Sequence, residues 1–252
     1  MKTTGACILL SLGILVSACE QSPVTGRQQL VLISPEQATE MGTEAYRQIL
    51  SESKISQDRS LRQRVEQVGS RIAAVVDRDN KYKWEFTVID DATPNAFALP
   101  GGKVGVHTGL FKVTENDAQL AAVLGHEIAH VTVRHSAERI SQQMVVQGGL
   151  VGIGAAAGGE YVNLAKTAAT LGVVLPFSRK QESEADQVGL RYMAEAGYDP
   201  RAAVKLWQNF AKAGGDRAPT FLSTHPAPGN RIEQIQARLP EVMPIYKKNM
   251  RG

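Results

Sequence analysis

Apolar residues recur at helical spacing along most of the chain, and only a short central region alternates between apolar and polar positions. The clearest helical stripe ends near residue 77 and consists of Leu61, Val65, Val68, Ile72 and Val75. Residues 84–89 (WEFTVI) alternate instead, which predicts a strand. Residues 96–99 and 103–107 flank the turn Pro100-Gly101-Gly102, so they predict a hairpin or an adjacent strand pair.

Capping signals mark the starts of further helices. Three segments fit the capping-box pattern: Ser34–Gln37, Thr114–Asp117 and Ser178–Gln181. The predicted helices cover residues 34–50, 61–77, 114–139, 178–196, 199–213 and 230–239. Because helices dominate and neither a repeat nor a long linker divides the chain, we predict a single, mainly helical α+β domain over residues 34–252 with one small mixed sheet.

Composition narrows the class of protein. Hydrophobic residues make up 43% of the 252 residues and charged residues 21%, which excludes disorder and collagen-like structure. The formal net charge is only +3, so nucleic acid is not an expected partner. Both cysteines, Cys7 and Cys19, lie near the N-terminus. Any metal in the folded body must therefore be held by histidine and carboxylate side chains.

The N-terminus has the pattern of an export signal. Lys2 precedes the apolar run of residues 6–16, which is too short to span a membrane as a helix. The following Val16-Ser17-Ala18-Cys19 resembles the bacterial lipobox, which implies a signal peptide over residues 1–18 and lipid chains on Cys19. Residues 19–33 then form a polar, lipidated tether, and Glu20 after the cysteine favours the outer membrane of a Gram-negative bacterium. The alternative is ordinary signal cleavage that leaves a free thiol.

The helix predicted over residues 114–139 carries His126-Glu127-Ile128-Ala129-His130, the HExxH pattern. Histidines four residues apart share a helix face and lie about 6 Å apart along the axis, so both can bind one ion. Glu127 lies about 100° round the helix, where it can contact a water bound to the metal without binding the metal itself. The alternative is a pair of buried core histidines, because this helix is largely apolar.

A catalytic zinc site has three protein ligands and one open position, so a further ligand is needed. Glu182 and Asp186 lie four residues apart on one face of the helix predicted over residues 178–196. Glu182 suits the third ligand position, and Asp186 can accept a hydrogen bond from the second nitrogen of a ligand imidazole. The alternative is a solvated acidic face among neighbouring basic residues.

These motifs together resemble a known family. HExxH, the SRxxExxAD segment over residues 178–186 and Thr224-His225-Pro226 are similar to motifs of the zinc metallopeptidases of the CaaX-prenyl-protease-1 and Oma clan, especially the secreted bacterial BepA- and LoiP-type lipoprotein metalloproteases. Residues 23–27 (PVTGR) and 95–98 (NAFA) also match. The resemblance implies a gluzincin-like zincin fold and one Zn²⁺ per chain.

The resemblance also implies roles for particular residues. In that family the glutamate matching Glu182 binds zinc, and the aspartate matching Asp186 supports a ligand. The histidine matching His225 either stabilises the transition state or moves onto zinc as a blocking fourth ligand. From the residues alone, His225 is a surface histidine in a proline-rich loop.

The expected reaction is peptide hydrolysis. Zinc on His126, His130 and Glu182 would lower the pKa of its water toward about 7 and polarise the scissile carbonyl. Glu127 would transfer the proton to the leaving amine, while His225 or the metal stabilises the oxyanion. We expect residues 103–107 to form the sheet edge beside this helix, where an extended chain could add as a strand. The expected substrate contacts are Asn95, Gly102, Lys103, Val104 and Gly105.

Two other histidines and one uncharged segment have less specific interpretations. His107 reads as a structural strand residue, and His135 as a surface residue or at most a support for a ligand. Residues 140–159 carry no charge and fit a membrane span, a lid over the active site or a buried helix. The wider Gly- and Ala-rich stretch, Met144 to Pro176, leaves the choice between lid and core open.

The function expected from these features is an outer-membrane-anchored, periplasm-facing zinc endopeptidase that degrades unfolded or misassembled envelope proteins. Latency through His225 would spare folded neighbours, and contact with outer-membrane assembly machinery is a further expectation. The alternative is a chaperone-like factor that holds unfolded outer-membrane chains in the same cleft. Glu127 favours the enzyme, because a pure binding protein needs no base beside the ligands. A purely structural zinc conflicts with a set of only three protein ligands.

Overall fold

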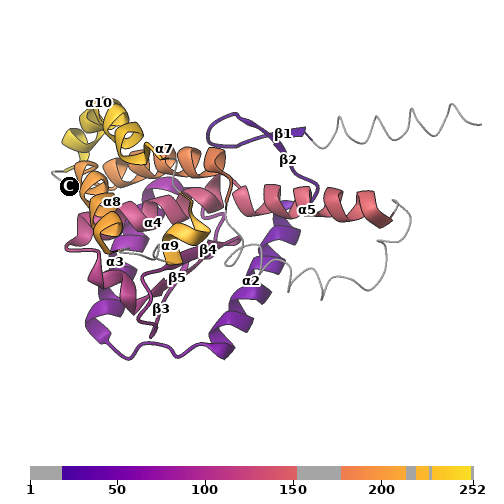
Figure 1. Ribbon diagram of the computed structural model, residues 1–252, viewed down its shortest axis with the longest axis horizontal. Coiled ribbons are helices and arrows are strands. Elements are labelled where there is room, and N and C mark those ends of the chain that lie inside the picture. Colours follow the sequence, from indigo (N-terminus) through magenta and orange to yellow (C-terminus); the bar gives the residue numbers. More distant parts are fainter. Residues whose placement is uncertain (1–18, 152–176, 214–219, 227–228, 251–252) are drawn as a thin grey trace, which may run out of the picture.

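The computed structural model describes residues 19–151, 177–213, 220–226 and 229–250 (Figure 1). Two helices, α4 (Asp117–Thr132) and α7 (Arg179–Glu195), run side by side through the middle of the molecule. Helices α3 (Arg59–Val76), α8 (Arg201–Ala213) and α10 (Arg231–Asn249) pack around this pair. The predicted stripe on α3 is buried at Val65, Val68 and Ile72, as its spacing requires.

Glycine allows α4 and α7 to approach closely. A Cβ atom on Gly189 would lie 2.8 Å from the backbone nitrogen of His126, and one on Gly125 would lie 2.9 Å from the carbonyl oxygen of Gly189. Real Cβ atoms do not tolerate such distances. The two backbones therefore meet directly beside the HExxH sequence.

A three-stranded sheet lies against α4 and consists of β3 (Glu85–Ile89), β4 (Ala96–Leu99) and β5 (Lys103–His107). Its order is β3-β5-β4, with β5 parallel to β3 and antiparallel to β4. The β4–β5 connection turns at Gly101 and Gly102, whose φ angles of 85° and 84° suit glycine. The mainly helical α+β architecture with a small mixed sheet is confirmed.

The prediction that residues 103–107 form the sheet edge is wrong. Strand β5 is the central strand and hydrogen bonds to neighbours on both sides. Strand β4 is the edge beside α4. The two strands and the turn between them have the pattern of a hairpin, and this local pattern does not show which of the two the more distant β3 joins.

Helix starts follow the predicted caps with one exception. Helix α2 (Pro35–Glu52) begins with the Ser34 capping box, and α7 begins with the Ser178 capping box. The cap of α4 is Asn116, whose side chain accepts a hydrogen bond from the backbone NH of Gln119. The predicted Thr114 box is therefore wrong by two residues. Thr114 instead follows a short 3₁₀ helix, η1 (Thr108–Lys112), and donates to the carbonyl of Leu110.

The helix predicted to continue to residue 139 is broken. Helix α4 ends at Thr132, and a separate helix, α5 (His135–Val151), follows it. Arg134 between them has a φ of 67°, in the left-handed region. Its guanidinium pairs with Glu20 at 2.7 Å and donates to the carbonyl of Ile33, so contacts with distant residues stabilise the break.

The predicted polar tether is folded. Strands β1 (Cys19–Gln21) and β2 (Gln28–Leu30) form an antiparallel hairpin that lies beside the start of α5. Arg27 joins this hairpin to the body through ion pairs with Glu138 and Glu184, at 2.7 and 2.5 Å. The boundaries at residues 19, 33 and 34 stay predictions.

Candidate active site

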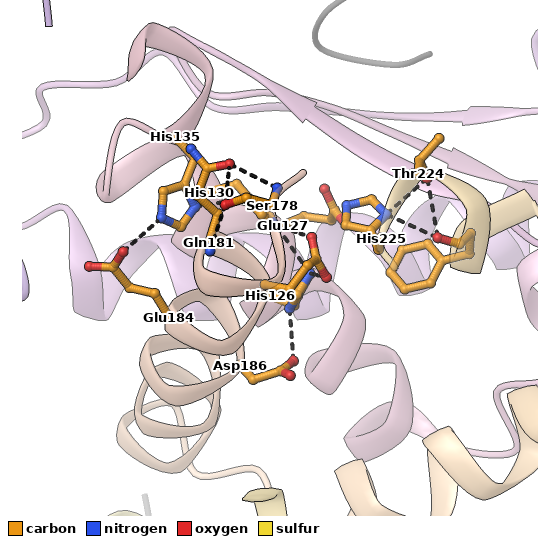
Figure 2. Close-up of polar contacts among 12 residues, drawn as sticks. His126, Glu127, His130, His135, Ser178, Gln181, Glu184, Asp186, Thr224 and His225 are labelled. Carbon is orange, nitrogen blue, oxygen red and sulfur yellow. Dashed lines mark hydrogen bonds and ion pairs between the residues drawn. The ribbon is translucent and has the colours of Figure 1, made fainter. Parts of the chain in front are cut away.

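Helix α4 places His126, Glu127 and His130 in the interior. All three side chains are at most 2% exposed, and the rest of the helix after Ala118 is also buried. The apolar faces pack on the sheet and on α7 and hold the helix rigidly. This packing fixes the orientation of the helix that carries the HExxH side chains, which Figure 2 draws.

Helix α7 places Glu182 and Asp186 opposite these histidines. Nε2 of His126 and Nε2 of His130 each lie 3.4 Å from a different carboxylate oxygen of Glu182, and the two nitrogens lie 3.1 Å apart. Three donors bound at about 2.0–2.1 Å in a tetrahedron would be about 3.3 Å apart. The distances between the donor atoms of His126, His130 and Glu182 thus match those expected of three ligands on one zinc ion.

The unsatisfied atoms of the cluster fit a cation. Both carboxylate oxygens of Glu182 are buried without a hydrogen-bond partner within the described part of the chain. A buried carboxylate without hydrogen bonds is unfavourable unless a cation compensates it. His126, His130, Glu182 and His225 each offer one donor atom, and these atoms lie within 4.8 Å of one another. The donor types suit Zn²⁺.

Asp186 orients His126 as predicted. Its Oδ1 lies 3.0 Å from Nδ1 of His126 (Figure 2). Nδ1–H donates to the carboxylate, which leaves the lone pair of Nε2 directed at the other donors.

His225 reaches the cluster from α9 (Thr220–Thr224), with its ring stacked on Phe221. It is 2% exposed, so the interpretation as a surface histidine is wrong. Its Nδ1 lies 3.2 Å from the carbonyl oxygen of Phe221 and donates to it. Nε2 therefore carries a lone pair, and it lies 3.3 Å from Oε1 of Glu127.

The environment makes Glu127 a strong base candidate. Burial, together with nearby Glu182, raises the pKa of Glu127 to about 8 although His126 opposes the shift. The backbone NH of Ala98 favours the charged form. Burial also lowers the pKa of His225 to about 3, so this histidine is neutral. A cation held by the neighbouring donors would oppose the rise in the Glu127 pKa and favour the ionised carboxylate that a general base requires.

Arg231 on α10 is a site residue that the sequence interpretation missed. Its guanidinium is buried, lies 2.6 Å from Asp186 and 3.2 Å from Glu182, and stacks on the Trp207 ring at 3.4 Å. It balances the two carboxylates of α7. The only sequence signal for Arg231 is its position shortly after the proline-rich loop. That signal is weak, because an arginine at the start of a helix does not indicate a site residue unless the fold is known.

His135, at the start of α5, is a buried support rather than a surface residue. Its Nδ1 lies 2.8 Å from Nδ1 of His130. His107 lies in β5, with Nδ1 3.5 Å from Asp91, as expected of a structural strand residue.

The predicted substrate contacts divide between the two strands. Lys103, Val104 and Gly105 belong to the central strand β5, so their backbone is not free to pair with an added chain. Asn95 directly precedes the edge strand β4, and its side-chain oxygen is buried without a partner among the described residues. Contacts of Asn95 and Gly102 with substrate stay predictions.

Two predictions fall largely outside the described residues. The segment Met144 to Pro176 is described only as far as Val151, so the choice between lid and core stays open. Residues 1–18 are likewise not described. Among the described helices, none combines the length and apolar character needed to cross a membrane.

Comparison with known proteins agrees with this site. The model of peptidase family M48 matches residues 59–239, which include all four donors. Mitochondrial metalloendopeptidase OMA1 of Schizosaccharomyces pombe is 40% identical over 230 residues, which cover 88% of this chain and 67% of the relative. OMA1 of Arabidopsis thaliana is 38% identical, over 67% of this chain and 35% of the relative.

Bacterial relatives also match. The beta-barrel assembly-enhancing protease of Escherichia coli is 30% identical over 220 residues, which cover 83% of this chain. The chain spans 45% of that relative's length. Because the family match contains the complete donor set together with Glu127, the chain belongs to peptidase family M48 and is a zinc metalloendopeptidase.

Proposed function

We propose that this metalloendopeptidase is anchored in the outer membrane through lipid on Cys19, faces the periplasm and cleaves unfolded or misassembled envelope proteins. We further propose that its resting form is latent through His225. The observation that carries the proposed latency is the position of Nε2 of His225. This atom lies close to the three metal donors and 3.3 Å from Oε1 of Glu127. The lipobox-like sequence and the relatives named beta-barrel assembly-enhancing proteases support the location and the substrate class.

The buried polar atoms that lack hydrogen-bond partners within the described residues indicate the chemistry of the site. Zinc bound by His126, His130 and Glu182 would supply a Lewis acid that polarises a carbonyl and acidifies water. Oε1 of Glu127 has no hydrogen-bond partner within the described residues, so it can accept the proton of the attacking water. The same carboxyl group then returns the proton to the leaving nitrogen.

His225 can act in two ways. Its lone pair at Nε2 would complete a tetrahedral donor set and leave no open position for substrate. Moved aside, with its hydrogen on Nε2 and with Nδ1 accepting from the Thr224 hydroxyl instead, the same ring could donate a hydrogen bond to the oxyanion. A latent enzyme uses the first arrangement at rest.

Strand β4 is the proposed substrate track. It is the sheet edge beside α4, and the NH of Ala98 is close enough to favour the charged form of Glu127. An extended chain added to this edge would pass the catalytic carboxylate. Recognition through backbone atoms gives little sequence preference, which suits unfolded substrates.

The test compares zinc content and cleavage of unfolded β-casein for the full chain in detergent, as wild type, Glu127→Gln and His225→Ala. We expect one zinc per chain in all three, no cleavage by Glu127→Gln and faster cleavage by His225→Ala. Loss of cleavage in His225→Ala would overturn latency and make His225 catalytic. If all three proteins bound zinc and none of them cleaved casein, the result would favour the alternative function, a chaperone-like factor that holds unfolded chains.

A second experiment tests the anchor. We expect acyl labelling and recovery in the outer-membrane fraction for the wild type, and loss of both in Cys19→Ser. Unlabelled wild-type protein would contradict the proposed location without affecting the peptidase chemistry.

A further inference from the structure

A buried series of polar contacts leads from the metal ligand His130 to the N-terminal hairpin. Nδ1 of His130 lies 2.8 Å from Nδ1 of His135, and Nε2 of His135 lies 3.1 Å from Oε2 of Glu184 (Figure 2). His130 and His135 are at most 1% exposed, and Glu184 is 8% exposed. The contact between the two histidines is therefore shielded from water, whereas Glu184 and Arg27 line a surface pocket at the outer end of the series.

The donors and acceptors in this series have one consistent assignment. Nε2 of His130 faces the other metal donors, so its hydrogen is on Nδ1. Nδ1 of His135 must then accept that hydrogen, which places the hydrogen of His135 on Nε2. Nε2–H donates to Glu184. The carboxylate thus fixes the tautomer of His135, which in turn fixes the ring of His130.

Glu184 is itself held by the hairpin. Nε of Arg27 lies 2.5 Å from Oε2 of Glu184, and the hydroxyl of Thr25 donates to the other carboxylate oxygen. The remaining nitrogens of Arg27 contact both oxygens of Glu138 on α5, at 2.8 and 2.7 Å. One guanidinium from the loop between β1 and β2 thus pairs with a carboxylate on each of two helices, and one of these carboxylates contacts His135.

We propose that the N-terminal hairpin is part of the metal centre: Arg27, Glu184 and His135 are positioning residues that set the orientation of His130. Without Arg27, the carboxylates of Glu138 and Glu184 would be partly buried with less compensating charge. Glu184 would turn toward solvent and release His135. The inference rests on the zinc site of the proposed function.

The matched control is the hairpin's other ion pair. Arg134 contacts Glu20 at 2.7 Å and joins β1 to the same region of the body. Although Arg134 directly precedes His135, no hydrogen bond or ion pair joins the side chains of Glu20 or Arg134 to those of His135 or Glu184 within the described residues. Glu20→Gln therefore weakens attachment of the hairpin while leaving the series intact.

The experiment measures zinc dissociation constants of the full chain in detergent by competition with a chelator, well below the unfolding temperature. We expect His135→Ala and Arg27→Gln each to raise the dissociation constant about 10- to 100-fold, the usual effect of removing an outer partner of a metal ligand. Because both act through Glu184, the double variant should bind zinc little worse than His135→Ala alone. Glu20→Gln should stay within about twofold of wild type.

Two results would overturn the inference. One is an unchanged dissociation constant in Arg27→Gln, and the other is an equal loss in Glu20→Gln. Should Arg27→Gln fail to fold, Thr25→Val removes only the hydroxyl contact with Glu184 and is expected to weaken zinc binding in the same direction. Absence of zinc from the wild type would contradict the proposed function itself. Failure of the proposed function can therefore be distinguished from failure of this inference.

Discussion

At the scale of single residues, Arg231 is a buried cation that two carboxylates of the site share. Its buried guanidinium contacts Asp186 at 2.6 Å and Glu182 at 3.2 Å, so two carboxylates depend on one cation. Trp207 covers the face of the guanidinium at 3.4 Å and excludes water from it. Removal of one partner from a buried ion pair leaves charge that nothing compensates.

We therefore expect Arg231→Gln to lower the free energy of unfolding by about 3–5 kcal/mol in the zinc-free protein. Urea unfolding measures this difference. The control is Arg191→Gln, which removes an exposed pair with Glu195 four residues away on α7. Such pairs contribute about 0.3–0.5 kcal/mol. Equal effects of the two substitutions would show that Arg231 does not balance the site.

Some site residues could be predicted from the sequence because their relation is local. His126, Glu127 and His130 share one helical turn, and Glu182 and Asp186 share another. Arg231 and His135 could not be predicted in this way. Arg231 lies 45 residues from Asp186 and His135 lies 49 residues from Glu184, so only the fold brings each pair together.

At the scale of elements, the contact between α4 and α7 determines whether the donors meet. The backbones touch at Gly125 and Gly189, and Glu182 lies about two turns before Gly189 on α7. A side chain at this crossing would move α7 away from α4. The three predicted zinc ligands come from these two helices, so their spacing depends on the crossing.

Gly189→Ala is accordingly expected to weaken zinc binding at least tenfold and to destabilise the protein by about 1–3 kcal/mol, because the added Cβ would lie 2.8 Å from the backbone of His126. Chelator competition and urea unfolding check both effects. Gly229→Ala is the control, since no atom of the described residues lies within 4 Å of a Cβ there. Unchanged zinc affinity in Gly189→Ala would contradict this account.

Local signals predicted most helices but not their interruptions. The Ser34 and Ser178 boxes and the α3 stripe depend on neighbouring residues alone. No glycine or proline marks the break at Arg134 in the sequence. The break is stabilised by contacts of Arg134 with the distant residues Glu20 and Ile33. Helix α10 has the opposite property: it continues through Pro240 and Pro244, because Ile235 and Val242 on either side of Pro240 are buried.

At the scale of the whole molecule, segments far apart in the sequence surround one cluster. Helices α4 and α7 supply the predicted ligands, α9 positions His225, and α10 supplies Arg231. The N-terminal hairpin closes the opposite side through Arg27, which contacts Glu138 on α5 and Glu184 on α7. This last contact depends on pH, because its two carboxylates must be ionised to pair with Arg27.

Acid should therefore loosen the hairpin. Burial opposes the charge of Glu138, but hydrogen bonds from Arg27 and Gln181 outweigh it and hold the pKa of this carboxyl below its ordinary value. A lowered folded-state pKa means that Glu138 stabilises the fold above about pH 4.3, its ordinary pKa. The contribution is lost as the pH falls through the lowered value.

We expect Glu138→Gln to reduce the free energy of unfolding by about 1.5–3 kcal/mol at pH 7, and by less at pH 3, in zinc-free protein. Urea unfolding at both pH values measures the two differences. Glu44→Gln is the control, because it removes an exposed pair with Arg47 on α2 and should cost little at either pH. A difference for Glu138→Gln that stayed constant with pH would mean that packing, and not its ion pair with Arg27, holds the hairpin to α5.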